Sequence, residues 1–151
     1  KIMIKKNRFL SSGFSLVELM AVIVIIGILA TVVAINVVPF LTRAHEEKVK
    51  ADFSQLSKAL ELFYLNEKVY PTTQQGLQAL RKEPKKLRKP HLYPKDGYIK
   101  QIPVDPWGHD YLYLSPGQRH SSYDIFSYGA DAIEGGDGEN LDLGNWSFEQ
   151  E

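Results

Sequence analysis

The sequence predicts an α+β protein in which a long N-terminal helix packs on a small antiparallel β-sheet. Three observations support this prediction. An apolar run extends from Phe14 to Leu41, with Glu18 as its only charged side chain. An amphipathic helical pattern follows, and two short runs rich in aromatic residues come later. We therefore expect a basic leader (residues 1–13), a membrane-spanning helix (14–41) and a soluble domain (42–151).

The apolar run is long enough to cross a bilayer as a helix, because about 20 such residues span the hydrocarbon core. The leader before it is basic and contains no acidic residue; its charges are Lys1, Lys5, Lys6 and Arg8. Positive charge on this side predicts a cytoplasmic N-terminus, with the domain after Leu41 on the other side of the membrane. A cleaved secretory signal peptide fits less well, because no A-x-A-like site follows Leu41.

Glu18 is unusual because it lies within the apolar run. An ionised carboxylate in hydrocarbon is costly unless it is paired, so an intramembrane glutamate indicates a functional site. The alternative is that Glu18 lies near the headgroups and is solvated, since it is close to the start of the helix.

The amphipathic pattern predicts a helix from Thr42 to Asn66. Its apolar positions recur at spacings of three and four, as on one face of a helix: Val49, Phe53, Leu56, Leu60 and Phe63. This face should meet the protein core, although a partner helix could also cover it. Pro39 lies between the two helical patterns and predicts a weak point from Asn36 to Pro39.

The remaining elements are short. Tyr70 and Pro71 should end the long helix, and Thr72 with Gln75 forms a capping-box pattern ahead of a short helix through Leu77 and Leu80. Strands are predicted at residues 111–114 and 123–128, joined by a turn containing Ser115, Pro116 and Gly117.

Charge gives little support for a nucleic-acid partner. Basic and acidic residues both number 18, and a basic segment between residues 81 and 89 lacks interleaved aromatic residues. This segment could contact anionic lipid, but we interpret it as a solvated loop. The chain contains no cysteine, so packing or a bound ion must stabilise the domain.

The segment 129–142 is acidic and rich in glycine, with five carboxylates and four glycines. Its composition fits either a flexible acidic loop or a calcium site, because calcium takes six to eight oxygen ligands and glycines permit tight turns. The spacing is not that of an EF-hand.

No catalytic motif is evident, and we expect a structural protein. The histidines are scattered without zinc-binding spacing, at His45, His91, His109 and His120. The sequence has no G-x-S-x-G elbow or phosphate-binding glycine loop. Members of a Ser-His-Asp triad can lie far apart in a sequence, so a triad stays an alternative.

A basic leader, a glycine, a phenylalanine and a glutamate at the fifth place of an apolar helix together resemble the class III signal of type IV pilins and type II secretion pseudopilins. The resemblance implies that a prepilin peptidase cuts between Gly13 and Phe14 and methylates the new N-terminus. The new amine at Phe14 could then neutralise Glu18 of a neighbouring subunit and set the register of assembly.

Two further stretches, residues 70–80 and the Asp105-Pro106-Trp107-Gly108 run, resemble major pseudopilins of type II secretion systems. This resemblance implies a pilin-like fold and an inner-membrane protein that assembles into a periplasmic filament. The filament would help to extrude folded proteins through an outer-membrane channel. Its partners would be further copies of the chain, minor pseudopilins and an inner-membrane assembly platform.

The resemblance also implies calcium as a cofactor in the acidic segment. Asp131 and Asp142 match the family pattern, whereas Glu139, Asn140 and the backbone carbonyl of Tyr128 are further candidate ligands. The other functions considered are a type IV pilus or competence pilin and a signal-anchored periplasmic calcium-binding module.

Overall fold

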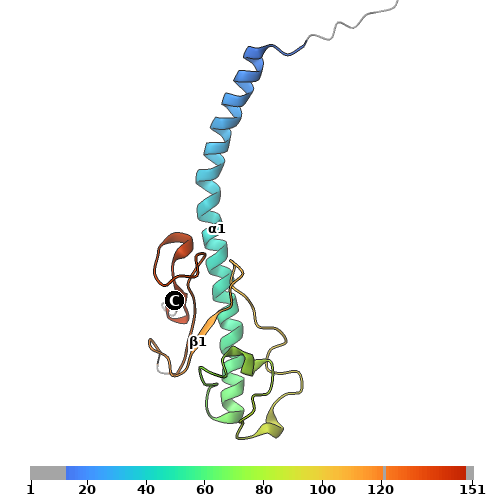
Figure 1. The fold of residues 1–151 in the computed structure, drawn as a ribbon, viewed down its shortest axis with the longest axis vertical. Coiled ribbons are helices and arrows are strands. Elements are labelled where there is room, and N and C mark those ends of the chain that lie inside the picture. The colour runs from blue at the N-terminus through green and yellow to red at the C-terminus, as the bar shows by residue number, and fades with distance from the viewer. Residues whose placement is uncertain (1–12, 121, 149–151) are drawn as a thin grey trace, which may run out of the picture. The chain divides into compact units, whose positions relative to one another are not determined.

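The computed structural model describes residues 13–120 and 122–148. The chain divides between Phe40 and Leu41 into two compact units, the first holding the apolar run and the second the remaining residues. The predicted fold class is confirmed: a long helix, α1, packs in the second unit on a three-stranded antiparallel sheet (Figure 1). Apart from Gly13, the basic leader lies outside the described residues.

Helix α1 is continuous from Leu16 to Glu67 and includes Pro39 in its interior. The weak point predicted near Asn36 is therefore helical in this structure. The helix ends where Lys68 adopts a positive φ of 61° and its N–H donates to the Tyr64 carbonyl over 2.7 Å. A left-handed residue of this kind is a common helix terminator.

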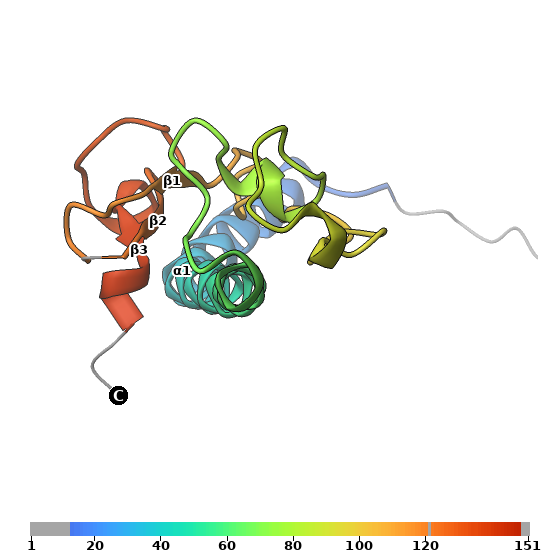
Figure 2. The ribbon, with the colours of Figure 1, turned by 90° about the horizontal axis from the view of Figure 1, so that it is seen from below.

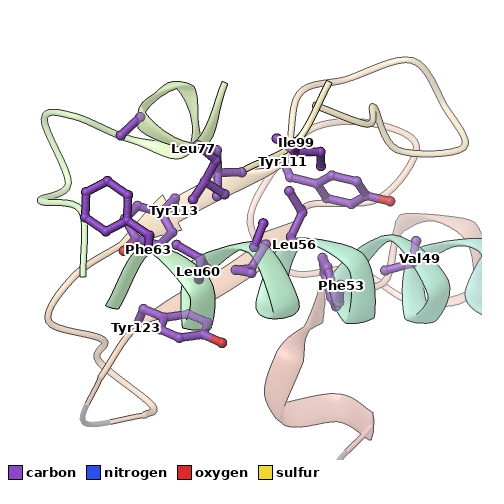
Figure 3. Packing of buried hydrophobic residues seen from close by; sticks show 14 of the residues in the cluster. Val49, Phe53, Leu56, Leu60, Phe63, Leu77, Ile99, Tyr111, Tyr113 and Tyr123 are labelled. Atoms are coloured by element: carbon purple, nitrogen blue, oxygen red, sulfur yellow. The ribbon is translucent and has the colours of Figure 1, made fainter. Parts of the chain in front are cut away.

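The apolar face of the second half of α1 is buried, as predicted. Val49, Leu56 and Leu60 are fully inaccessible to solvent. Figure 3 shows residues of this face opposite Leu77 and Tyr111, which belong to the segments that follow the helix. The interpretation of this stripe as a core face, rather than as a coiled-coil seam, is therefore confirmed.

The sheet contains β1 (Leu112–Leu114), β2 (Asp124–Ser127) and β3 (Leu143–Gly144), in that order. Both pairings are antiparallel, with Tyr113 opposite Ile125 and Phe126 opposite Gly144. Two strands were predicted, but β3 was missed because it has only two residues and no alternating pattern. A Cβ atom on Gly144 would lie 2.3 Å from the Trp146 ring, so glycine is needed there for close packing.

Between α1 and the sheet the chain forms two short 3-10 helices, η1 (Leu77–Leu80) and η2 (Pro90–Leu92). The Thr72 N–H donates to Gln75 Oε1, and the Gln75 N–H donates to Thr72 Oγ1. The predicted capping box is therefore present, but it closes a turn ahead of η1, whose N-cap is Gly76. Figure 2 shows this segment and the strands on the same side of α1.

Three buried carboxylates organise the loops of the second unit. Glu67 accepts the backbone N–H groups of Arg88 and Lys89, which ties the basic segment to the end of α1. Asp105 accepts the N–H groups of Trp107 and His109 and the hydroxyl of Ser127, while Asp124 accepts three N–H groups from residues 118–120. Each of these charges is thus hydrogen-bonded, as burial requires.

Candidate functional site

The first unit presents an apolar surface on all sides. Every side chain that the structure describes between Gly13 and Phe40 is exposed, including Val17 at 75% and Ile35 at 68%. By length and composition α1 can cross a membrane. An apolar helix exposed around its whole circumference requires lipid or other protein as its surroundings.

Glu18 caps the start of α1, a role that the sequence analysis missed. Its Oε2 accepts the backbone N–H of Ser15 at 3.1 Å, and its own N–H donates to Ser15 Oγ at 3.2 Å. These reciprocal bonds form a capping box. The Ser15-x-x-Glu18 spacing is the sequence signal for this capping box, but Glu18 was interpreted only as a charge within a membrane segment.

Gly13 lies immediately before Phe14 in the described chain, and neither residue belongs to α1. A Cβ atom added to Gly13 would meet no other atom within 4 Å. The fold of the described residues therefore does not require glycine at this position.

In the second unit the candidate site is the loop of residues 129–142, called here the C-terminal loop. The Ala130 N–H donates to the Glu139 carbonyl at 2.8 Å, which closes the base of the loop. Gly129 has a φ of 73°, and a Cβ there would lie 2.7 Å from the Glu139 carbonyl oxygen. Glycine is needed at this position for both reasons.

Glu139 fastens this loop to α1. Its carboxylate accepts hydrogen bonds from Thr42 Oγ1 at 2.5 Å and from the Trp107 indole N–H at 2.8 Å, and it pairs with His45 Nδ1 at 2.7 Å. We call these four residues the Glu139 clasp. The hydrogen bond from Thr42, supported by those from His45 and Trp107, lowers the pKa of Glu139 although burial opposes the shift.

The clasp bears on the surroundings of Trp107 and on the role of Glu139 as a candidate calcium ligand. An indole N–H needs an acceptor when its ring is partly buried, and Glu139 accepts the one of Trp107. The Glu139 carboxylate, a candidate calcium ligand, is directed toward α1 and already accepts these bonds. The short 3-10 helix η3 (Gly138–Asn140) carries both Glu139 and Asn140.

The other candidate ligands lie around the same loop. Asp131 Oδ1 accepts the N–H of Ile133, and Asp142 Oδ2 accepts the N–H of Gly135. Asp142 Oδ1 is buried and has no hydrogen-bond partner among the residues that the structure describes. Asp142 and Tyr128 line a cavity of about 270 Å³.

Within residues 13–120 and 122–148, no three acidic, histidine or cysteine side chains are grouped as they would be around a metal ion. A cation in the C-terminal loop would therefore depend on amide and backbone oxygens as well as on carboxylates. The orphaned Asp142 Oδ1 fits a hard cation, because such an ion satisfies a buried carboxylate oxygen.

The histidines occupy separate parts of the fold. His109 Nδ1 lies 3.6 Å from Asp105 Oδ2, and Ser127 donates its hydroxyl to that same oxygen at 2.7 Å. In a catalytic triad the serine would instead be hydrogen-bonded to the histidine. This cluster holds β2 against the turn at residues 105–109.

Two family models match the chain. One, for protein G of the type II secretion system, covers residues 36–146. The other, the prokaryotic N-terminal methylation motif, covers residues 8–34. Together the two matches include both units of the structure.

Sequence and structure comparisons with individual proteins identify the same family as these two models. The chain is 46% identical to type II secretion system core protein G of Vibrio cholerae, over 91% of this chain and 93% of that protein. It is 45% identical to the core protein G of Pseudomonas aeruginosa, over 93% and 98%. The crystal structure of the major pseudopilin of enterohaemorrhagic Escherichia coli matches with a TM-score of 0.64 and 40% identity, over 75% of this chain and 96% of that one.

The fold and the apolar stem define a pilin-like structural protein. More specifically, the chain belongs to the type II secretion system protein G family, the major pseudopilins.

Proposed function

We propose that this chain is the structural subunit of a type II secretion pseudopilus. It inserts once in the bacterial inner membrane, with its N-terminus in the cytoplasm and its second unit in the periplasm. It then polymerises into a periplasmic filament that helps to extrude folded proteins through an outer-membrane channel. Minor pseudopilins and an inner-membrane assembly platform are the expected partners, and the ATPase that drives assembly also belongs to a partner.

The exposed apolar surface of the first unit is the observation that carries this proposal. Between Gly13 and Phe40 all described side chains are exposed, and most are large and apolar. Lipid covers this surface before assembly, and the same segments of neighbouring copies cover it in a filament. A signal-anchored module that stays dispersed needs only the lipid.

Assembly on overproduction separates these alternatives. The full chain is produced together with the secretion machinery, and the cells are sheared. The released material is examined by electron microscopy and by intact-mass spectrometry. We expect filaments of this chain; protein that remains dispersed in the membrane would contradict the proposal.

Processing between Gly13 and Phe14 is part of the proposal. The methylation-motif match spans these residues, and the described part of the fold gives no structural reason for glycine at this position. A peptidase that approaches the backbone closely provides such a reason. We expect mature protein to lack residues 1–13 and to carry an added methyl group, and we expect Gly13→Leu to accumulate as precursor. Normal-length mature protein from this variant would overturn the assignment.

We further propose that Glu18 sets the register of assembly by pairing with the amine created at Phe14 of a neighbouring subunit. The capping bonds to Ser15 hold the carboxylate beside the chain segment in which this amine is created. Glu18→Leu should insert in the membrane at least as well as wild type but assemble poorly. Ser15→Ala, which weakens the cap and keeps the carboxylate, is the matched control.

Calcium binding by the C-terminal loop is the remaining part of the proposal. Asp142 with its unpartnered Oδ1, Asp131, Asn140 and the Tyr128 carbonyl are the candidate ligands. A bound calcium ion would supply positive charge among these oxygens. Asp142 would hold the ion beside β3, and Asp131 would contribute from the start of the loop.

Thermal unfolding tests the ion directly. A ligand at a hundredfold excess over its Kd stabilises the folded state by about 2.7 kcal/mol. We therefore expect chelation to lower the melting temperature of the second unit, and Asp142→Asn to abolish the response to added calcium. Magnesium should restore stability poorly because it requires a tighter octahedral site. Identical melting curves with calcium and with chelator would show an ordinary acidic loop.

A further inference from the structure

A groove with aromatic walls lies beside the second half of α1 and has no role in the function proposed above. It has a volume of about 620 Å³. Its accessible aromatic surface comes from Tyr70 and Phe148, which are half-buried, whereas Phe53 and Tyr123 also line it but are buried. Its basic residues are Lys50 and Arg119. We call this the aromatic groove.

The groove continues along α1 toward an exposed leucine. A neighbouring hollow shares Ser57 and Tyr123 with the aromatic groove and extends to Leu62, which is 51% exposed. Glu61, an acidic residue on this surface, accepts the Tyr70 hydroxyl at 2.7 Å. The combined surface is therefore aromatic, partly apolar and bordered by basic side chains.

The C-terminal loop carries a feature of complementary chemistry. Ile133 is 65% exposed, more than any other large apolar side chain among the described residues of the second unit. Acidic Asp131 and Glu134 flank it. The loop tip is held outward because the Ile133 N–H donates to Asp131 Oδ1, Ala132 has a φ of 56°, and the loop is closed at its base.

We propose that the tip of the C-terminal loop, residues 131–134, docks into the aromatic groove of a second copy of this chain. Ile133 would contact Tyr70 and Phe148, and the Glu134 carboxylate would face Arg119. The proposal rests on the filament function, which brings many copies together. Tip and groove are different surfaces, so the contact is heterologous, and such contacts propagate into open helical assemblies when they do not close a ring.

The chemistry of the groove favours this occupant over residues 149–151 of the same chain. Glu149, Gln150 and Glu151 follow Phe148 in the sequence and could meet the basic side chains. They bring no apolar side chain to the aromatic walls. The loop tip supplies both kinds of contact.

A first experiment compares two exposed apolar residues of the same loop. Ile133→Ser should lower the yield of sheared filaments about tenfold or more, as expected for loss of an anchor residue at an interface. Leu141→Ser, at a position 43% exposed in the other arm of the loop, is the control and should assemble like wild type. Both variants should keep the melting temperature and calcium response of wild type. Normal filaments from Ile133→Ser would overturn the docking proposal.

A second experiment tests proximity, using the absence of cysteine from the natural sequence. Ile133→Cys combined with Ser57→Cys should give a ladder of disulfide-linked multimers when assembled filaments are oxidised. Ile133→Cys combined with Leu65→Cys is the control, because Leu65 is exposed on α1 but does not line the groove. This pair should give no ladder.

The outcomes separate the two proposals. If wild type forms filaments but the Ile133→Cys, Ser57→Cys variant gives no disulfide ladder, the docking contact is overturned and the filament function stands. Failure of wild type to form filaments would contradict the filament function itself. A disulfide within one chain between Ser57→Cys and Gln150→Cys, with normal assembly of Ile133→Ser, would assign the groove to the chain's own C-terminal residues.

Discussion

Both halves of α1 are rich in apolar side chains, but they distribute them differently. In the first unit apolar residues surround the helix and all of those described are exposed. In the second unit they form one stripe, and Val49, Leu56 and Leu60 are completely buried. The first half thus requires an apolar environment supplied by other molecules, whereas the second half supplies one face of the core of its own domain.

Because the apolar stripe of the second half lies on one face of the helix, the same substitution should have very different effects on its two faces. Phe63→Ala should lower the free energy of unfolding of the second unit by about 3–5 kcal/mol, because the ring is 2% exposed and its removal leaves a cavity. Leu62→Ala, one residue away but 51% exposed, should change it by less than about 0.5 kcal/mol. Thermal or denaturant unfolding of the full chain in detergent measures both. Equal effects would mean that the stripe is not the core.

A charge introduced in the first half should reduce membrane insertion without affecting the folding of the second unit. Ile25→Arg should reduce membrane insertion by about 3 kcal/mol on the insertion scale, because the arginine would lie far from either end of the apolar run. The melting temperature of the second unit should not change. Fractionation of membranes after an alkaline wash measures insertion, with Ile25→Ala as the control. Undiminished insertion of Ile25→Arg would place this segment outside the hydrocarbon.

The smallest expected effect concerns pH and the Glu139 clasp. Because hydrogen bonds lower the pKa of Glu139 in the folded state, its contribution is present above the ordinary value of 4.5 and is lost as pH falls through the lower folded value. The Glu139 side chain is about one third exposed, so we expect only about 1 kcal/mol. Wild type should lose more stability than Glu139→Gln on acidification from about pH 5 to about pH 3. Parallel melting curves would exclude this role.

Sequence patterns predicted the elements whose signal is carried by many residues. Periodicity identified the buried face of α1, and runs of aromatic residues identified β1 and β2. The third strand escaped because two residues carry no period, and its Gly144 is explained only by the Trp146 ring packed against it.

The candidate site was predicted less completely. The acidic composition identified the C-terminal loop, but it did not reveal that Glu139 is directed toward Thr42 and His45. Those partners lie 97 and 94 residues away in the sequence, and no local pattern encodes such a contact. The Ser15–Glu18 cap could have been predicted from its local S-x-x-E spacing, but Glu18 was interpreted through its charge alone.

The Glu139 clasp joins Glu139 to residues 97 and 94 positions earlier in the sequence, so it can form only late in synthesis of the domain. Synthesis proceeds from the N-terminus, so Thr42 and His45 exist long before Glu139 does. Until Glu139 has been made, the start of the domain's helix lacks a partner that only the end of the chain provides. A chain truncated before Glu139 would keep most of the buried stripe but leave His45 and Trp107 without their shared acceptor. The clasp thus distinguishes a finished subunit from an unfinished one.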